Sequence, residues 1–186
     1  MDAGASIVIP QVDTVEQAKH VVAGVRYGKN IGGGRSAPPF RYLAGVTDMK
    51  VDATKSHHVN MNQQAALMIQ VESEEGVRNL DAILTECPEI DMVWLGRLDA
   101  RVSMGLAAHD APNGWNEPEW LEVERIYAET VKKHNKPHSG FCFAEGEELA
   151  KQTGNMAMVL TGADVTALAG LADVARKSKE ALRLTK

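Results

Sequence analysis

Two acidic residues, Glu72 and Asp99, each follow a short apolar segment that is predicted to be a strand. Glu72 comes directly after residues 66–71, and Asp99 lies just beyond residues 92–95. The C-terminal ends of parallel strands meet at one edge of a sheet, where ligands bind in open α/β sheets and in barrels. Two carboxylates at that edge suit a hard divalent ion such as Mg²⁺, which takes one or two protein carboxylates and keeps water or substrate oxygens as its other ligands. We therefore expect a metal site.

Both acids also have a purely structural interpretation. Each precedes or begins a helical stretch, and a negative charge there is stabilised by the helix dipole. This alternative is strongest for Glu72, because Ser73-Glu74-Glu75 follows it and is typical of an acidic helix N-terminus. The sequence leaves both interpretations open.

Glu72 and Asp99 can meet only if the strands before them are parallel neighbours, which requires a helix to connect one strand to the next. Thr14 and Gln17 form a capping-box pattern at the start of one helix, and Pro118 occupies the first position of another. The segment from Gly28 to about Asn60 is rich in glycine and proline and is predicted to be a long functional loop with room for a short helix. The five βα units indicate an α/β protein with a parallel sheet. The expected strands are 5–9, 66–71, 92–95, 140–143 and 156–160, and the expected helices are 14–27, 73–84, 117–134, 145–152 and 166–184.

The composition predicts one globular domain over residues 1–186, because 44% of the residues are apolar and 24% are charged. A net charge of −5 gives no reason to expect binding to nucleic acid or to an anionic membrane. The two cysteines, Cys87 and Cys142, have no zinc-site spacing and fit reduced thiols. We therefore expect a cytoplasmic protein.

Several segments together resemble the HpcH/HpaI aldolase family, which shares its fold with the citrate lyase β-subunit. The similarity runs over nearly the whole chain, and its motifs are specific in combination. The general family pattern is matched by Asp2–Ala5, Ile9–Val12, Ile69–Ser73 and Leu95–Asp99, and a fungal branch of the family is matched by Gly33–Phe40, Gln64–Ser73 and Val93–Gly96.

The resemblance implies a TIM-type (β/α)8 barrel that binds phosphoenolpyruvate or pyruvate, of which this chain matches the C-terminal part, about five βα units. It further implies that Glu72 and Asp99 bind Mg²⁺, or Mn²⁺ or Co²⁺, and that the substrate is a 2-oxo acid of the pyruvate or oxaloacetate type. The implied reaction is aldol cleavage or decarboxylation through a metal-stabilised enolate. Family members are commonly homo-oligomers that exchange C-terminal helices. The residues implied in substrate binding are Pro10, Gln11, Gly96 and Leu98.

The resemblance also shows departures. The catalytic histidine and the substrate-binding arginine of the family belong to the first barrel strands, which have no match in this chain. Arg97 stands where the family has a proline, and it could bind an anionic substrate or point to solvent. Arg97 and Arg101 are therefore the candidates for catalytic roles, with His57 and His58 as further ones. Two alternatives remain open: a catalytically degenerate half-barrel, and a bond-forming or pericyclic enzyme of fungal secondary metabolism.

Overall fold

The computed structural model describes residues 1, 5–36, 52, 54–109, 114–142, 144–154 and 156–183. These residues form two compact units, residues 1–138 and residues 139–186. The expectation of a single domain over residues 1–186 stays a prediction. No helix in the described part of the chain has the length and apolar character needed to cross a membrane.

Three parallel strands form the sheet of the first unit. β1 (Ile7–Ile9) pairs with β2 (Leu67–Val71), and β2 pairs with β3 (Met92–Leu95), so that Val71 stands opposite Leu95. Successive side chains of a strand point to opposite faces of the sheet. Leu67, Ile69 and Val71 are fully buried in the main core, whereas Met68 and Gln70 lie on the other face. The predicted strands at 66–71 and 92–95 are confirmed within one residue.

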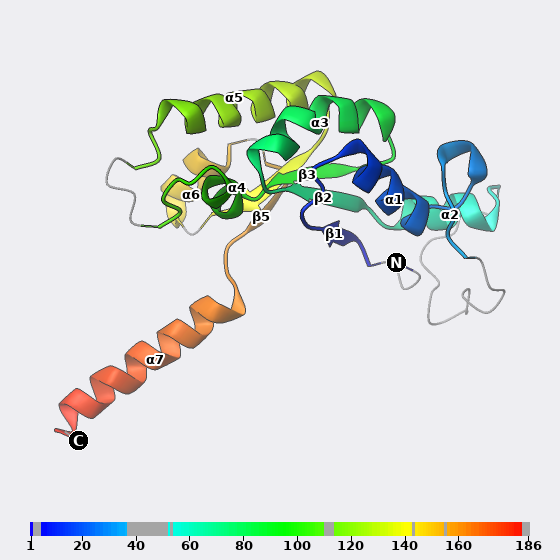
Figure 1. Ribbon diagram of the computed structural model, residues 1–186. Coiled ribbons are helices and arrows are strands. Elements are labelled where there is room, and N and C mark those ends of the chain that lie inside the picture. Colours follow the sequence, from blue (N-terminus) through cyan, green and yellow to red (C-terminus); the bar gives the residue numbers. More distant parts are fainter. Residues whose placement is uncertain are drawn as a thin grey trace. The chain divides into compact units, whose positions relative to one another are not determined.

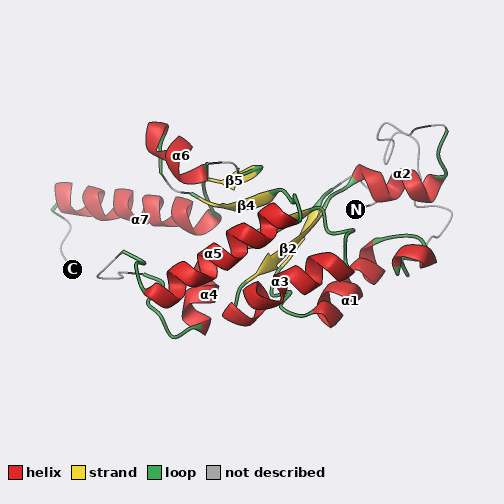
Figure 2. Cartoon of the chain, turned by 90° about the horizontal axis from the view of Figure 1, so that it is seen from above, coloured by secondary structure: helices red, strands yellow, loops and turns green. Residues whose placement is uncertain are grey.

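Three helices cover the first of these faces (Figure 1): α1 (Val15–Val25), α3 (Glu74–Glu86) and α5 (Pro118–Lys133). They lie side by side, with α3 between α1 and α5 (Figure 2). The predicted helix starts are confirmed, because Thr14 and Gln17 form the capping box of α1 and Ser73 Oγ accepts from the backbone N–H of Gly76 in α3. The helices bury a stripe of apolar residues against the strands, made of Val77, Leu80, Ile83, Leu84, Trp120, Val123 and Tyr127.

Short helices depart most from the sequence-based expectation. α4 (Arg97–Ser103) follows β3 after a single residue, Gly96, in a stretch for which no helix was expected. It has seven residues and no side-chain N-cap, so neither apolar periodicity nor a capping signal marks it in the sequence. Within the predicted loop 28–60, the structure has a 3₁₀ turn η1 (Lys29–Ile31) and the start of α2 (His57–Gln64). Residues 37–51 and 53 of that loop lie outside the described residues.

In the second unit, β4 (His138–Phe141) and β5 (Met158–Leu160) pair in parallel, with Gly140 opposite Val159. Gly140 packs closely against Met156, because a Cβ at residue 140 would stand 3.1 Å from Cε of Met156. The helices of this unit are α6 (Gly146–Thr153) and α7 (Asp164–Ala181). The predicted elements are confirmed with shifts of one to three residues at their ends. Phe143 and Leu184, which were expected in the strand and the last helix, lie outside the described residues.

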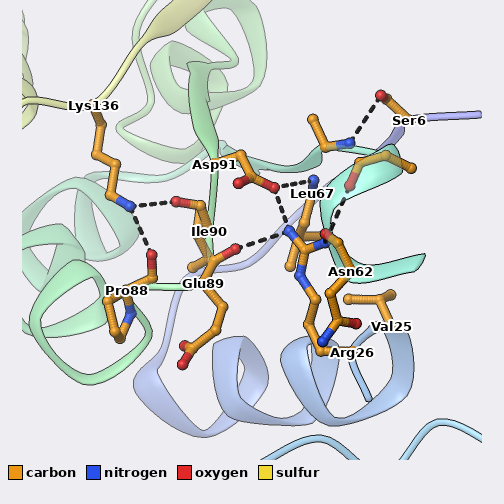
Figure 3. Close-up of polar contacts among 12 residues, drawn as sticks. Ser6, Val25, Arg26, Asn62, Leu67, Pro88, Glu89, Ile90, Asp91 and Lys136 are labelled. Atoms are coloured by element: carbon orange, nitrogen blue, oxygen red, sulfur yellow. Dashed lines mark hydrogen bonds and ion pairs between the residues drawn. The ribbon is translucent and has the colours of Figure 1, made fainter. Parts of the chain in front are cut away.

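A buried arginine joins the N-terminal ends of β2 and β3 (Figure 3). The guanidinium of Arg26, which is only 3% exposed, donates to the carbonyl oxygens of Asn62 (2.7 Å), Ala65 (3.1 Å) and Glu89 (3.1 Å). It also forms an ion pair with Asp91, whose carboxylate accepts from the backbone N–H of Leu67 at 2.7 Å. One side chain thus satisfies carbonyl groups that would otherwise be buried without partners at the ends of the strands.

We expect Arg26→Lys to lower the free energy of unfolding by about 2–3 kcal/mol, because a single ammonium group cannot reach these four acceptors and leaves some of them unsatisfied. Urea denaturation measures the change. Arg125→Lys is the matched control: Arg125 forms exposed ion pairs on α5, where the same substitution should cost less than about 0.5 kcal/mol. Equal costs for the two substitutions would contradict the importance assigned to Arg26.

Candidate metal centre

The structure brings Glu72 and Asp99 together. Glu72 directly follows β2, and Asp99 lies in the first turn of α4, which begins immediately after the neighbouring strand β3. The two carboxyl groups are close enough for a hydrogen bond between them, and the charge of Asp99 raises the pKa of Glu72. The pair therefore forms where the sequence predicts it, at the C-terminal edge of two adjacent parallel strands.

The segment after β1 holds the Glu72 carboxylate in place. The backbone N–H of Gln11 donates to Oε2 of Glu72 at 3.0 Å. Gln11 has a φ of +54°, a left-handed conformation that is uncommon for a residue other than glycine and has an energetic cost. The next residue is anchored to β2, because the N–H of Val12 donates to the carbonyl oxygen of Gln70 at 3.1 Å. Gln11, named in the sequence analysis for substrate binding, thus lies in contact with Glu72.

Gly96 stands opposite Glu72 and leaves room for its side chain. A Cβ on Gly96 would lie 2.6 Å from Cγ and 2.8 Å from Oε1 of Glu72, and 2.8 Å from Nε2 of Gln70. These separations are too short for any real side chain, so residue 96 must be glycine if Glu72 is to occupy this position. The same contacts place the Gln70 amide beside the carboxylate pair. Gln70 was missed in the sequence analysis, although a polar residue within an otherwise apolar strand is a usable signal.

Asp13 is the second residue that the sequence analysis missed. Its Oδ1 accepts from the backbone N–H of Glu72 at 3.4 Å, and its charge is a further cause of the raised pKa of Glu72. Asp13 packs against the start of α3, where Gly76 has no Cβ to obstruct it and Asn79 donates to its backbone carbonyl oxygen at 2.9 Å. No local pattern in the sequence marks Asp13, because it is distant from Glu72 along the chain and is brought there by its packing against α3.

The electrostatics of this edge favour a cation. Partial burial is the largest cause of the raised pKa of Glu72, followed by the charge of Asp99, and the hydrogen bond from Gln11 opposes both. A divalent ion bound between Glu72 and Asp99 would offset the repulsion between the two carboxylates.

In the described ranges no group of three or more His, Cys, Asp and Glu side chains could hold a metal ion. Two carboxylates are nevertheless a complete protein ligand set for Mg²⁺, so the donors fit the expected ion.

Neither arginine of α4 contacts the pair through a hydrogen bond or ion pair that the structure describes. The Nε atom of Arg97 lies 3.3 Å from Oε1 of Glu124 on α5, and the Arg97 side chain is about half exposed. Arg101 is fully buried and forms a bidentate ion pair with Glu117. Arg97 thus joins α4 to the body of α5, and Arg101 joins α4 to Glu117, the residue before α5. We therefore assign no catalytic step to either of them.

The other residues named in the sequence analysis divide between the two ends of the sheet. Pro10 and Leu98 are exposed; Leu98 precedes Asp99, and Pro10 precedes Gln11, which contacts Glu72. The ring of His58 lies 5.1 Å from that of Tyr27, which follows α1 and is next to Arg26, so His58 is at the N-terminal end of the strands and away from the pair. His57 begins α2, which leads into the same end of β2.

Comparisons with known proteins agree with this geometry. The family model described as HpcH/HpaI aldolase/citrate lyase matches residues 1–118, which include Glu72 and Asp99. A 2-keto-3-deoxy-L-rhamnonate aldolase from Klebsiella pneumoniae is 30% identical over 138 residues, which are 72% of this chain and 45% of that protein. The chain thus spans less than half the length of this curated relative.

Two solved structures have the same fold. The HpcH/HpaI aldolase of Desulfitobacterium hafniense superimposes with a TM-score of 0.73 at 21% identity, over 95% of this chain and 64% of that one. Macrophomate synthase superimposes with a TM-score of 0.71 at 26% identity, over 95% of this chain and 60% of that one. These likenesses confirm the predicted fold class, an α/β chain with part of a (β/α)8-type barrel.

We expect Glu72→Gln to stabilise the metal-free protein at neutral pH by about 0.5 kcal/mol, a small effect because solvent screens partly exposed charges. The pKa of Glu72 is raised in the folded state, so ionised Glu72 disfavours folding and stability decreases as the pH rises above the ordinary pKa of this carboxyl. Urea denaturation in a metal chelator at pH 7 and at pH 4 measures this change. The difference should become small at pH 4, where the Glu72 carboxyl is mostly protonated in both states.

Glu75→Gln is the control for this measurement, because it removes the same charge from the exposed first turn of α3. It should give no stabilisation, since an acidic residue there interacts favourably with the helix dipole. A wild type that is as stable as Glu72→Gln at pH 7 would contradict the repulsion at the pair.

Proposed function

The chain belongs to the HpcH/HpaI aldolase/citrate lyase family, and from this premise we propose that it is a divalent-metal-dependent carbon–carbon lyase. Its substrate would be a 2-oxo acid of the pyruvate or oxaloacetate type, and its ion Mg²⁺, Mn²⁺ or Co²⁺. The observation that carries the proposal is the contact between Glu72 and Asp99 at the C-terminal edge of adjacent strands. The 2-keto-3-deoxy-L-rhamnonate aldolase that it resembles supports an aldol cleavage.

Each residue around the pair has a defined role in this proposal. Glu72 and Asp99 hold the ion through carboxylate oxygens, and the Gln11 N–H fixes the orientation of Glu72. Gly96 keeps the space above Glu72 open. When bound, the ion supplies positive charge that stabilises the negative charge developing on the 2-oxo acid as its carbon–carbon bond breaks. The exposed residues Pro10 and Leu98, together with Gln11 and Gly96, would contact the bound acid.

In the lyase direction, the bond between C3 and C4 of a 4-hydroxy-2-oxo acid breaks. Its electron pair stays with the pyruvate fragment, and the C4 hydroxyl group loses its proton to water as the aldehyde forms. A proton from water then adds to C3 and completes pyruvate. In the decarboxylation of oxaloacetate the same electron pair is released by loss of CO₂. The two reactions therefore require the same charge stabilisation, which is why one carboxylate pair could serve either of them.

Binding of Mn²⁺, measured by calorimetry or electron paramagnetic resonance, tests this proposal. We expect Glu72→Gln and Asp99→Asn each to weaken Mn²⁺ binding at least tenfold, because each removes a charged ligand from a site that has only two. Glu75→Gln is the control and should bind as the wild type does. Equal weak binding by the wild type and all three variants would refute the metal site.

The same proteins should be assayed for release of pyruvate from oxaloacetate and from a 4-hydroxy-2-oxo acid. Metal-dependent turnover by the wild type that is lost in Glu72→Gln supports the lyase. Tight metal binding without turnover of either substrate supports a catalytically degenerate half-barrel, a possibility that follows from the partial match to the relatives. Similarity to macrophomate synthase supports a second candidate, a synthase in which the pyruvate fragment attacks an acceptor and forms a bond.

We further propose that the protein works as a homo-oligomer in the cytoplasm. Within residues 139–186, α7 exposes a stripe of apolar side chains whose members are each 60–66% exposed: Val165, Leu168, Leu171 and Val174. Most of the stability of a helix in a protein comes from the packing of its apolar face, and none of the residues of α7 (Asp164–Ala181) is buried in this structure. A second copy of the chain would cover this stripe. The two cysteines are buried and unpaired, which supports a reducing compartment.

We expect Leu168→Asp with Leu171→Asp to shift the protein from oligomer to monomer, because buried aspartates would oppose the apolar contact. Sedimentation velocity measures the change. The control is Glu147→Asp with Glu148→Asp, a double substitution in the exposed first turn of α6 that keeps the charge. A wild type that sediments as a monomer at high concentration would exclude this interface.

A further inference from the structure

Arg101 occupies an unusual environment on the short helix that carries Asp99. Its side chain is completely buried, and all of its hydrogen bonds in the described structure join α4 to the following segment. Nε donates to the carbonyl oxygen of Ala107 at 2.8 Å, and the two terminal nitrogens donate to the two carboxylate oxygens of Glu117 at 2.9 and 2.8 Å. This fork-to-fork geometry fixes the orientation of both partners and not only their distance.

Two tryptophans enclose the ion pair. The central guanidinium carbon of Arg101 lies 4.9 Å from the ring centroid of Trp115 and 5.2 Å from that of Trp120. The two rings are 5.9 Å apart and nearly perpendicular. Trp120 of α5 is fully buried in the main core, so the guanidinium is held against the core of the first unit. An arginine in such a cage has a single orientation available to it.

The partner of Arg101 is the residue that begins α5. Glu117 occupies the N-cap position but makes no side-chain capping bond, because its carboxylate is turned toward Arg101. This hydrogen bond is the largest cause of the lowered pKa of Glu117. The ion pair thus links the short helix α4 to a helix of 16 residues that packs on α3 and on the strands.

The spacing of Arg101 and Asp99 connects this cage to the metal centre. Residues two apart on an α-helix are separated by about 200° around its axis, so they lie on opposite sides. In agreement, Arg101 is fully buried whereas Asp99 is exposed. With only seven residues and no side-chain N-cap, α4 has little stability of its own. Ala100 packs into the core, and Arg97 forms an ion pair with Glu124. Arg101, however, makes the bidentate bond that constrains how far α4 is rotated and so where the Asp99 carboxylate stands.

We propose that Arg101 is a positioning residue for the metal centre: through its caged ion pair with Glu117 it sets the rotation of α4 and so holds Asp99 against Glu72. The inference rests on the proposed function, because it assigns to the pair the role of binding the metal. Arg101 has no contact with the substrate or the ion in this role, which distinguishes it from a catalytic residue.

Arg101→Lys tests the inference, because lysine keeps the charge but loses the bidentate bond and the flat surface that stacks on the tryptophans. We expect the dissociation constant for Mn²⁺ to rise about tenfold, as when a residue that orients a metal ligand is removed. Hydrogen exchange of the amides of residues 97–103, measured without metal, should become faster by a similar factor. Glu117→Gln is the milder second variant, and it should shift both quantities in the same direction.

Arg26→Lys is the matched control. It also removes a buried, ion-paired arginine of the first unit, but at the N-terminal ends of β2 and β3. It should leave the dissociation constant for Mn²⁺ unchanged, although it lowers stability. Wild-type affinity in Arg101→Lys overturns the inference, and so does an equal loss of affinity in Arg26→Lys, because affinity would then follow overall stability.

If the wild type binds no Mn²⁺, that titration alone refutes the proposed function, and no variant is needed. The exchange measurement then still decides whether Arg101 orders α4: faster exchange confined to Arg101→Lys and Glu117→Gln supports that part, and unchanged exchange overturns it. Failure of the metal site and failure of the positioning role therefore give different results.

Discussion

The parallel pairing of β2 with β3 is the constraint on which the candidate site depends. Its register places Val71 opposite Leu95, so the next residues, Glu72 and Gly96, stand side by side where the strands end. Glu72 can occupy this position because Gly96 has no side chain, and α4 can begin there and present Asp99. A shift of one residue between the strands would move Glu72 away from Gly96 and turn alternate side chains to the wrong face.

The two ends of these strands have opposite electrostatic properties. At the N-terminal ends, Arg26 is neutralised by Asp91 and satisfies carbonyl groups, so its burial stabilises the fold. At the C-terminal ends, Glu72 is held near Asp99 and Asp13 with a raised pKa, so the acids repel one another and reduce stability. In proteins of this architecture, the N-terminal ends of the strands commonly contribute to stability and the C-terminal ends carry the binding site. A binding site reduces stability because its charged groups are not already paired within the protein.

The α4 segment shows how a site residue depends on contacts remote from it. Its seven residues lie between a strand and a loop, and its orientation depends on the contacts that Arg101 makes with Glu117 and the two tryptophans. Arg101 was a candidate for a catalytic role because the histidine and arginine of the family have no match in this chain. Its complete burial between Trp115 and Trp120 instead makes it part of the scaffold.

The sequence by itself determined the elements whose signals are local: the buried strands, the capping box at Thr14, the cap at Ser73, and the positions of Glu72 and Asp99 at strand ends. These signals depend on periodicity and on neighbours within about four residues, so a single sequence contains them. Only the tertiary structure decided that α4 is a helix, that Asp13 and Gln70 lie beside the pair, and that Arg101 is buried. Each of these depends on contacts between segments distant along the chain, and packing there overrides local preference.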